Sequence, residues 1–158
     1  MRLWRLVKEQ HVATALSGIG GMFTSGRWHH QGTLVVYMSS TPSLCALELL
    51  VHVDPLIAPS SLQLVELSVP DNLEVETVDP SSITTEWRSY PAPLVLADFG
   101  TRWVRELRTP LLRVPSALTA LGTDGVETNF LLNPSHPLAA SASVVGSTAF
   151  AFDTRLLR

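Results

Sequence analysis

Apolar residues in this chain fall into short runs that proline, glycine and serine repeatedly interrupt, and this pattern restricts the fold most. Runs of about four to eight residues rich in β-branched and aromatic side chains are typical of strands. The expected strands are residues 3–7, 34–38, 62–69, 73–78, 111–114, 126–132 and 148–152. Two segments suit substantial helices, residues 40–53 and 94–107, and a short helix is expected at 9–16. The sequence therefore predicts a single α+β domain, residues 1–158, with strands in the majority.

Three of these segments carry more specific expectations. Pro70, Asp71 and Asn72 separate two predicted strands, which are therefore expected to form a hairpin or a tight connection. The helix at 40–53, capped by one of the hydroxyl residues at its start, is apolar nearly all round and is expected to be buried. Glu48 within it then needs a polar partner. The proline-rich stretch 79–93 is expected to be a flexible loop.

The composition excludes several classes of protein. Hydrophobic residues make up 46% and charged residues 16%, with a mean hydropathy of +0.23, so the chain is not intrinsically disordered. A net charge of -3 gives no general attraction to nucleic acid or to an anionic membrane. No segment suits a signal peptide or a membrane span, and the single cysteine, Cys45, cannot form an internal disulfide. We expect a cytoplasmic protein without nucleic-acid or membrane partners.

Familiar catalytic and metal-binding motifs are missing. The sequence has no GxGxxG, GxxxxGK[ST], HExxH, CxxC or GxSxG motif. Its histidines do not have the spacing of metal ligands, so no metal is expected. A serine hydrolase is disfavoured because no serine lies on a glycine-flanked turn between a strand and a helix.

A set of polar residues within otherwise apolar elements remains. Its members are Arg5, Arg27, Tyr37, Glu48, Ser116 and Asn129. Lys8 is the one lysine among 11 basic residues, and the forked guanidinium of arginine suits phosphate and carboxylate oxygens, although compositional bias also explains this preference. Each member has a structural alternative: an edge-strand position for Arg5, carbonyl capping by Arg27, ordinary core packing of Tyr37, pairing of Glu48 with His52, turn closure by Ser116, and a loop-backbone bond for Asn129.

These residues occur, in order, within short motifs that resemble the RES-domain family, named for its arginine, glutamate and serine. The motifs are Leu3-Trp4-Arg5, Gly26-Arg27-Trp28, Val36-Tyr37, the helical stretch 46–52, Val114-Pro115-Ser116-Ala117, Glu127-Thr128-Asn129, residues 133–137 and residues 152–156. They span almost the whole chain. Ser25 and His29 depart from the Gly-Gly-Arg-Trp-Asn loop that is usual in this family.

The resemblance implies a fold similar to ADP-ribosyltransferases of the diphtheria-toxin type and an activity that consumes NAD as its substrate. Its members are commonly toxins of bacterial toxin–antitoxin pairs, so an Xre-type antitoxin is the expected partner. The leading hypothesis is cleavage of the nicotinamide–ribose bond with transfer to water or phosphate. The alternatives are ADP-ribosylation of a host protein and a non-catalytic binding module.

The resemblance also assigns expected roles to the residues. Catalysis is expected from Glu48, Arg27 and Ser116, with the Glu48 carboxylate facing the cationic sugar of the transition state. NAD binding is expected from Arg5, Arg27, Tyr37, Ser116 and Asn129. The two arginines would hold the diphosphate, and the tyrosine ring would pack against nicotinamide or ribose.

Overall fold

A computed structural model describes residues 1–52, 61–119 and 127–157 of the chain. The described strands are β1 (Arg2–Lys8), β2 (Val36–Ser39), β3 (Leu62–Ser68), β4 (Val75–Thr77), β5 (Leu111–Val114), β6 (Asn129–Leu132) and β7 (Ser143–Phe150). Two α-helices, α1 (Pro42–Leu50) and α2 (Leu94–Arg105), accompany them. The 3₁₀ helices are η1 (Glu9–Thr14), η2 (Ile19–Met22), η4 (Pro80–Ser82), η5 (Pro137–Ser141) and η6 (Thr154–Leu157). The prediction of an α+β fold with mostly strands and two main helices is confirmed.

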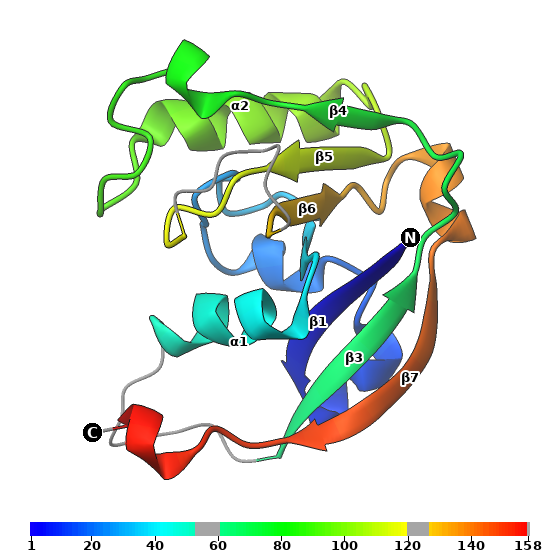
Figure 1. Cartoon of the computed structure of the whole chain (residues 1–158). Coiled ribbons are helices and arrows are strands. Elements are labelled where there is room, and N and C mark those ends of the chain that lie inside the picture. The colour runs from blue at the N-terminus through cyan, green and yellow to red at the C-terminus, as the bar shows by residue number, and fades with distance from the viewer. Residues whose placement is uncertain (53–60, 120–126, 158) are drawn as a thin grey trace.

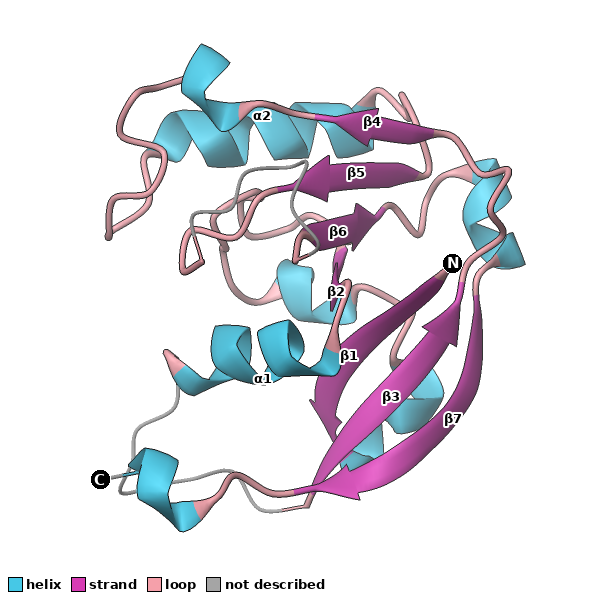
Figure 2. Cartoon of the chain, in the orientation of Figure 1, coloured by secondary structure: helices cyan, strands magenta, loops and turns pink. Residues whose placement is uncertain are grey.

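The strands form one sheet in the order β4-β5-β6-β2-β1-β3-β7. Neighbouring strands are antiparallel except for β4 and β5, which are parallel. Figure 1 shows the strands in two groups, with β4, β5 and β6 above and β1, β3 and β7 running at an angle below. The helix α1 lies between these two groups and contacts β1 and β2 (Figure 2).

The predicted hairpin between residues 62–69 and 73–78 is wrong. Strand β3 pairs with β1 and β7, whereas β4 pairs with β5 in the other half of the sheet. The turn at Pro70–Asn72 instead lets the chain pass from one half to the other. Local turn signals were present, but the pairing partners are distant in sequence.

Both faces of the sheet are covered around β5 and β6. Adjacent residues on a strand point to opposite faces, so Leu111 belongs to one apolar cluster with Leu3 and Val65, and Leu112 belongs to a second with Trp103. The second cluster contains most of the apolar face of α2. Strands that are buried on both faces form a rigid platform on which side chains can be positioned.

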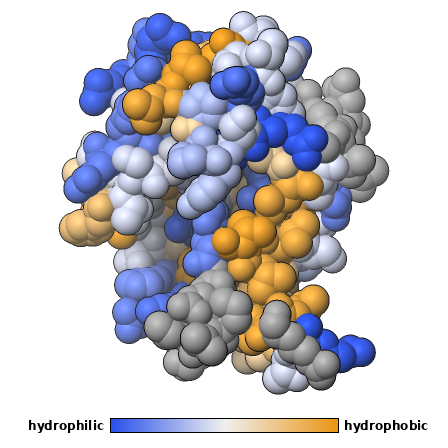
Figure 3. All heavy atoms as spheres, turned by 90° about the vertical axis from the view of Figure 1, so that its left-hand side faces the viewer, coloured by the Kyte–Doolittle hydropathy of each residue, from blue (hydrophilic) through white to orange (hydrophobic). Residues whose placement is uncertain are grey.

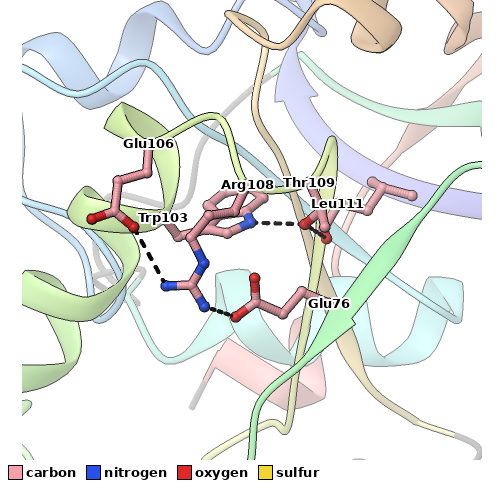
Figure 4. A network of polar contacts seen from close by, with 6 residues as sticks. All are labelled: Glu76, Trp103, Glu106, Arg108, Thr109 and Leu111. Atoms are coloured by element: carbon pink, nitrogen blue, oxygen red, sulfur yellow. Dashed lines mark hydrogen bonds and ion pairs between the residues drawn. The ribbon is translucent and has the colours of Figure 1, made fainter.

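The C-terminal end of α2 is fastened to the sheet by a polar network (Figure 4). Arg108 pairs with Glu76 of β4 and lies 3.8 Å from a carboxylate oxygen of Glu106. The fully buried indole of Trp103 donates its N–H to the Thr109 hydroxyl (2.9 Å), which in turn donates to the Leu111 carbonyl (2.7 Å). The polar groups that accompany this helix into the core are therefore satisfied.

The expectation that the helix at 40–53 is buried is wrong in part. Thr41 caps α1 by accepting from the Leu44 N–H (3.1 Å), and the helix buries Leu44 and Cys45 against the sheet. Leu47 and Val51, however, are 38% and 52% exposed. Figure 3 shows the face of the molecule toward which the C-terminal end of α1 points, and apolar residues gather in one area of that face. An all-apolar helix is buried only where neighbours exist on every side.

Other boundaries differ from the predictions in detail. The short helix predicted at 9–16 is the 3₁₀ helix η1 (Glu9–Thr14), and β7 begins several residues before the predicted strand 148–152. Leu94 and Leu107, at the two ends of the predicted helix 94–107, are 73% and 42% exposed. Residues 53 and 126, which ended one prediction and began another, lie outside the described residues. None of the described helices has the length and apolar character needed to cross a membrane.

Candidate active site

Glu48 lies on the face of α1 that turns toward the sheet. Residues three and four apart share one face of a helix, so Glu48 follows the buried Leu44 and Cys45 into the interior. Its Oε1 atom accepts a hydrogen bond from the Ser116 hydroxyl (2.7 Å) and one from the Asn129 amide (2.6 Å). The expected need for a polar partner is met in this way. The suggested pairing with His52 is not formed, and His52 is exposed.

The two donors come from neighbouring strands of the rigid half of the sheet. Ser116 follows the end of β5, and Asn129 is the first residue of β6. Ser116 is 1% exposed and also accepts from the Leu118 N–H (3.1 Å), so it closes a turn and binds Glu48 at once. Both donors end on Oε1, and among the described residues no hydrogen bond reaches Oε2. Two donors therefore hold one oxygen of the carboxylate, and the other oxygen is left without a hydrogen bond to the described residues.

Ser39 extends this network and was not among the predicted residues. Its hydroxyl donates to Oδ1 of Asn129 (2.8 Å), the residue directly opposite it in the pairing of β2 with β6. Ser39 is 4% exposed. Ser39 lies two residues after Tyr37 on a buried strand, so both side chains point to the same face, which is a weak indication that Ser39 belongs to the site. The pairing of β2 with β6, which brings Ser39 to Asn129, could not be known from one sequence.

Arg27 lies at the tip of a tight turn. The Gly26 N–H donates to the His29 carbonyl (2.9 Å), which leaves Arg27 and Trp28 at the two central positions. Gly26 is required because a Cβ atom there would lie 2.7 Å from Cε1 of His29 and 2.9 Å from the Tyr37 hydroxyl. The side chain of Arg27 therefore takes no part in the hydrogen bonds that close the turn.

The helix α2 holds this turn in place. Trp28 is buried in the α2 cluster, and its carbonyl oxygen lies so close to Gly100 that a Cβ atom there would approach it to 1.9 Å. The Thr101 hydroxyl accepts from the His30 N–H (2.9 Å), and His30 Nε2 lies 2.7 Å from an Asp98 carboxylate oxygen. The position of Arg27 thus depends on a helix about 70 residues later in the chain, which its neighbours in sequence could not reveal.

The guanidinium of Arg27 donates to main-chain carbonyls of the loop that precedes α2. It binds the carbonyls of Trp87 and Ser89, the latter at 3.3 Å from both terminal nitrogens. Carbonyl capping, the structural alternative for Arg27, is therefore confirmed. Burial lowers the pKa of Arg27, and the negative charge of Glu48 opposes this shift. Glu48 is thus close enough to act on Arg27 electrostatically.

Tyr37 is fixed by its hydroxyl. It accepts from the Trp28 N–H (3.2 Å) and lies 2.8 Å from Nδ1 of His29. His29 Nε2 lies 3.0 Å from the Thr24 carbonyl, which can only accept, so Nε2 carries the proton and Nδ1 accepts from Tyr37. Burial raises the pKa of Tyr37, which keeps the hydroxyl neutral. His29 thus supplies the polar contacts at the position where the family usually has asparagine.

Arg5 occupies an interior position on β1, which lies between β2 and β3 in the sheet. The edge-strand alternative is therefore wrong. One terminal nitrogen of its guanidinium is buried without a hydrogen-bond partner, and burial lowers its pKa. Arg5 lies near Cys45, which is three residues before Glu48 on α1. Among the described residues, no hydrogen bond or ion pair joins Arg5 to Glu48 or Arg27. The clamp of the two arginines on a diphosphate therefore stays a prediction.

The described residues contain no cluster of three or more side chains suited to a metal ion. The site is instead built from a carboxylate, guanidinium groups, hydroxyls and an amide. It combines one half-paired carboxylate with a nearby cation, which suits a substrate that carries both negative charge and a developing positive charge.

Comparison with known families identifies the family of this chain. The family model described as "RES domain" matches residues 2–154. This chain belongs to the RES domain family. The match includes the positions of Arg5, Arg27, Glu48 and Ser116.

Relatives of this RES domain cover nearly its full length. A protein named Toxin Res from Yersinia enterocolitica is 36% identical over 157 residues, covering 99% of each chain. A protein named Prs ADP-ribosylating toxin from a Sphingobium species is 35% identical over 159 residues, covering 98% of this chain and 96% of its own length. The toxin–antitoxin complex MbcT–MbcA of M. tuberculosis contains a chain with the same fold, with a TM-score of 0.70 at 16% identity over 99% of this chain and 86% of that one.

Proposed function

We propose that this RES domain is the toxin of a bacterial toxin–antitoxin pair and that it consumes NAD by breaking the nicotinamide–ribose bond. The observation that carries this proposal is the half-paired carboxylate of Glu48. Its Oε1 accepts from Ser116 and Asn129, and its Oε2 has no hydrogen bond to the described residues. A carboxylate held on one side is oriented without being neutralised.

This geometry suits the chemistry of the bond that breaks. The electron pair of the bond between ribose C1′ and nicotinamide nitrogen leaves with nicotinamide, which departs as a neutral molecule and needs no acid. The sugar is left with oxocarbenium character, as in glycoside cleavage. A fixed carboxylate stabilises this cation more than it stabilises the bound substrate, so it lowers the barrier. Water or phosphate then adds to C1′ and loses a proton.

The arginines suit the diphosphate of NAD. Arg27 makes three hydrogen bonds to the loop carbonyls. Its guanidinium has five N–H donors, so the remaining donors can bind phosphate oxygens. Arg5 has a buried nitrogen without a partner, a costly arrangement that an anionic ligand would relieve. Tyr37 uses its hydroxyl internally, so its ring, which is partly exposed, is the part left to pack against the ligand.

A second candidate acceptor is a protein side chain. The relative named Prs ADP-ribosylating toxin, 35% identical over nearly the full length, favours this alternative. The bond that breaks and the residues around it are the same in both cases, and only the group that attacks C1′ differs.

The structural similarity to a chain of the MbcT–MbcA toxin–antitoxin complex supports an antitoxin partner for this protein. The resemblance to RES toxins suggests that the antitoxin is of the Xre type. We expect a cytoplasmic pair, because NAD and a host enzyme target are both found there.

The proposal is tested by incubating the purified protein with NAD labelled in its adenylate part and measuring free nicotinamide. We expect nicotinamide release. Label that stays in small molecules supports transfer to water or phosphate, and label that follows a protein band in an added lysate supports protein modification. An absence of nicotinamide release under all these conditions would contradict the proposal.

The toxin role is tested separately in cells. Expression from a tightly controlled promoter is expected to arrest growth and lower cellular NAD, whereas Glu48→Ala is expected to do neither. Equal toxicity of the two proteins would favour the non-catalytic binding module instead.

A further inference from the structure

We propose that Ser39 is a positioning residue that acts on Glu48 through Asn129. The inference rests on the proposed function, because it assigns Ser39 a part in the same reaction. The Ser39 hydroxyl donates to Oδ1 of Asn129 at 2.8 Å, and Nδ2 of Asn129 donates to Oε1 of Glu48 at 2.6 Å. A continuous series of hydrogen bonds therefore joins Ser39 to the carboxylate.

The amide of Asn129 has two ends of similar shape but opposite hydrogen-bonding character. An ionised carboxylate can only accept, so the amide must present its NH₂ group to Glu48. Rotated by half a turn, the same side chain would place its carbonyl oxygen against Oε1 and repel it. Something must therefore distinguish the two orientations of Asn129.

Ser39 makes this distinction because its hydroxyl donates to the carbonyl end of the amide. Ser39 is 4% exposed, so water cannot easily replace the hydroxyl. The two residues are directly opposite each other in the pairing of β2 with β6, and β2 is itself held between β6 and β1. The backbone positions that set this hydrogen bond are thus fixed by the sheet.

The other donor to Glu48 is supported in a parallel way. The Ser116 hydroxyl accepts from the Leu118 N–H at 3.1 Å, which directs its own hydrogen toward Glu48. Each donor to Oε1 is therefore oriented by a further group behind it. Removal of Ser39 would leave Asn129 free to rotate and Glu48 held by Ser116 alone, so the free oxygen Oε2 would lose its fixed direction.

The test measures nicotinamide release (kcat) and NAD binding (Kd) for wild type, Ser39→Ala, Asn129→Ala and the double variant. We expect Ser39→Ala to lower kcat about 10-fold, which corresponds to about 1.4 kcal/mol, the size of one hydrogen bond. The Kd for NAD is expected to change less than kcat, because Ser39 acts on the direction of the carboxylate. In the Asn129→Ala background, Ser39→Ala is expected to have no further effect on kcat, because its action passes through Asn129. Ser39→Thr, which keeps the hydroxyl, is expected to restore kcat.

Thr109→Val is the matched control, because it removes a buried hydroxyl with two hydrogen bonds far from Glu48 in the network of α2. It is expected to lower the unfolding temperature but to leave kcat unchanged. An active wild type with an equally active Ser39→Ala, or equal losses of kcat from Ser39→Ala with and without Asn129, would overturn this inference alone. A wild type that releases no nicotinamide would overturn the proposed function and this inference with it.

Discussion

Arg5 carries a positive charge into the interior of the sheet with one nitrogen left without a partner. A buried polar atom without a hydrogen-bond partner costs free energy, which the oxygen atom of a bound ligand would recover. Arg27, in contrast, is oriented by loop carbonyls before any ligand arrives. A ligand would therefore give Arg5 a missing hydrogen-bond partner, whereas it would bind an Arg27 side chain that is already oriented.

Replacement of Arg5 by methionine is expected to separate stability from function. Arg5→Met should raise the free energy of unfolding of the ligand-free protein by about 1 kcal/mol, since it removes a buried guanidinium nitrogen that has no hydrogen-bond partner. It should also weaken NAD binding about 10-fold, the loss expected for a charge-assisted hydrogen bond. Urea unfolding and calorimetric titration measure the two effects. Arg2→Met, at an exposed position of the same strand paired with Glu66, is the control and should change neither. Weaker binding accompanied by lower stability would contradict this account.

His29 is expected to make stability depend on pH. Burial lowers the pKa of His29 below its ordinary value of 6.5, so the unfolded chain takes up a proton at a higher pH than the folded protein. Stability is therefore full above pH 6.5 and is lost as the pH falls through the lowered pKa. His29→Asn should remove this part of the slope between pH 7.5 and 5.5 in urea unfolding. An identical slope in both proteins would show that His29 is not its source.

At the scale of elements, the decisive contact is the close approach of α2 to the turn that carries Arg27. Gly100→Ala would place a Cβ atom 1.9 Å from the Trp28 carbonyl oxygen, where backbone and not a flexible side chain must move. We expect a loss of about 1–3 kcal/mol in the free energy of unfolding, together with weaker NAD binding. Gly20→Ala is the matched control, because nothing lies within 4 Å of its new Cβ atom. Comparable stability of the two variants would contradict the proposed role of α2.

The sequence predicted elements well where the signal was local. Periodicity and caps located β1, α1, α2 and β5, and the ordered polar residues indicated a site at Glu48, whose hydrogen bonds to Ser116 and Asn129 the structure shows. The separation of β3 from β4 and the exposure of Leu47 were missed, because both depend on which distant elements are neighbours. Ser39 was missed for the same reason.

At the scale of the whole molecule, the site depends on the order of the sheet. The pairing of β2 with β6 and of β6 with β5 brings Ser39, Asn129 and Ser116 together beneath α1. The net charge of -3 would not attract an anionic dinucleotide, so binding must rely on a few arginines placed locally. Locally placed arginines thus allow a mildly acidic protein to bind an anionic ligand.

The central claim, that the Glu48 carboxylate acts on the transition state, is tested most directly by Glu48→Gln. This change keeps the size of the side chain and an oxygen to accept from Ser116 and Asn129, but it removes the charge. The measurement is the turnover rate for nicotinamide release beside the Kd for NAD. We predict a fall in kcat of about 100-fold or more with little change in Kd. A variant that binds NAD and releases nicotinamide as fast as wild type would contradict the account.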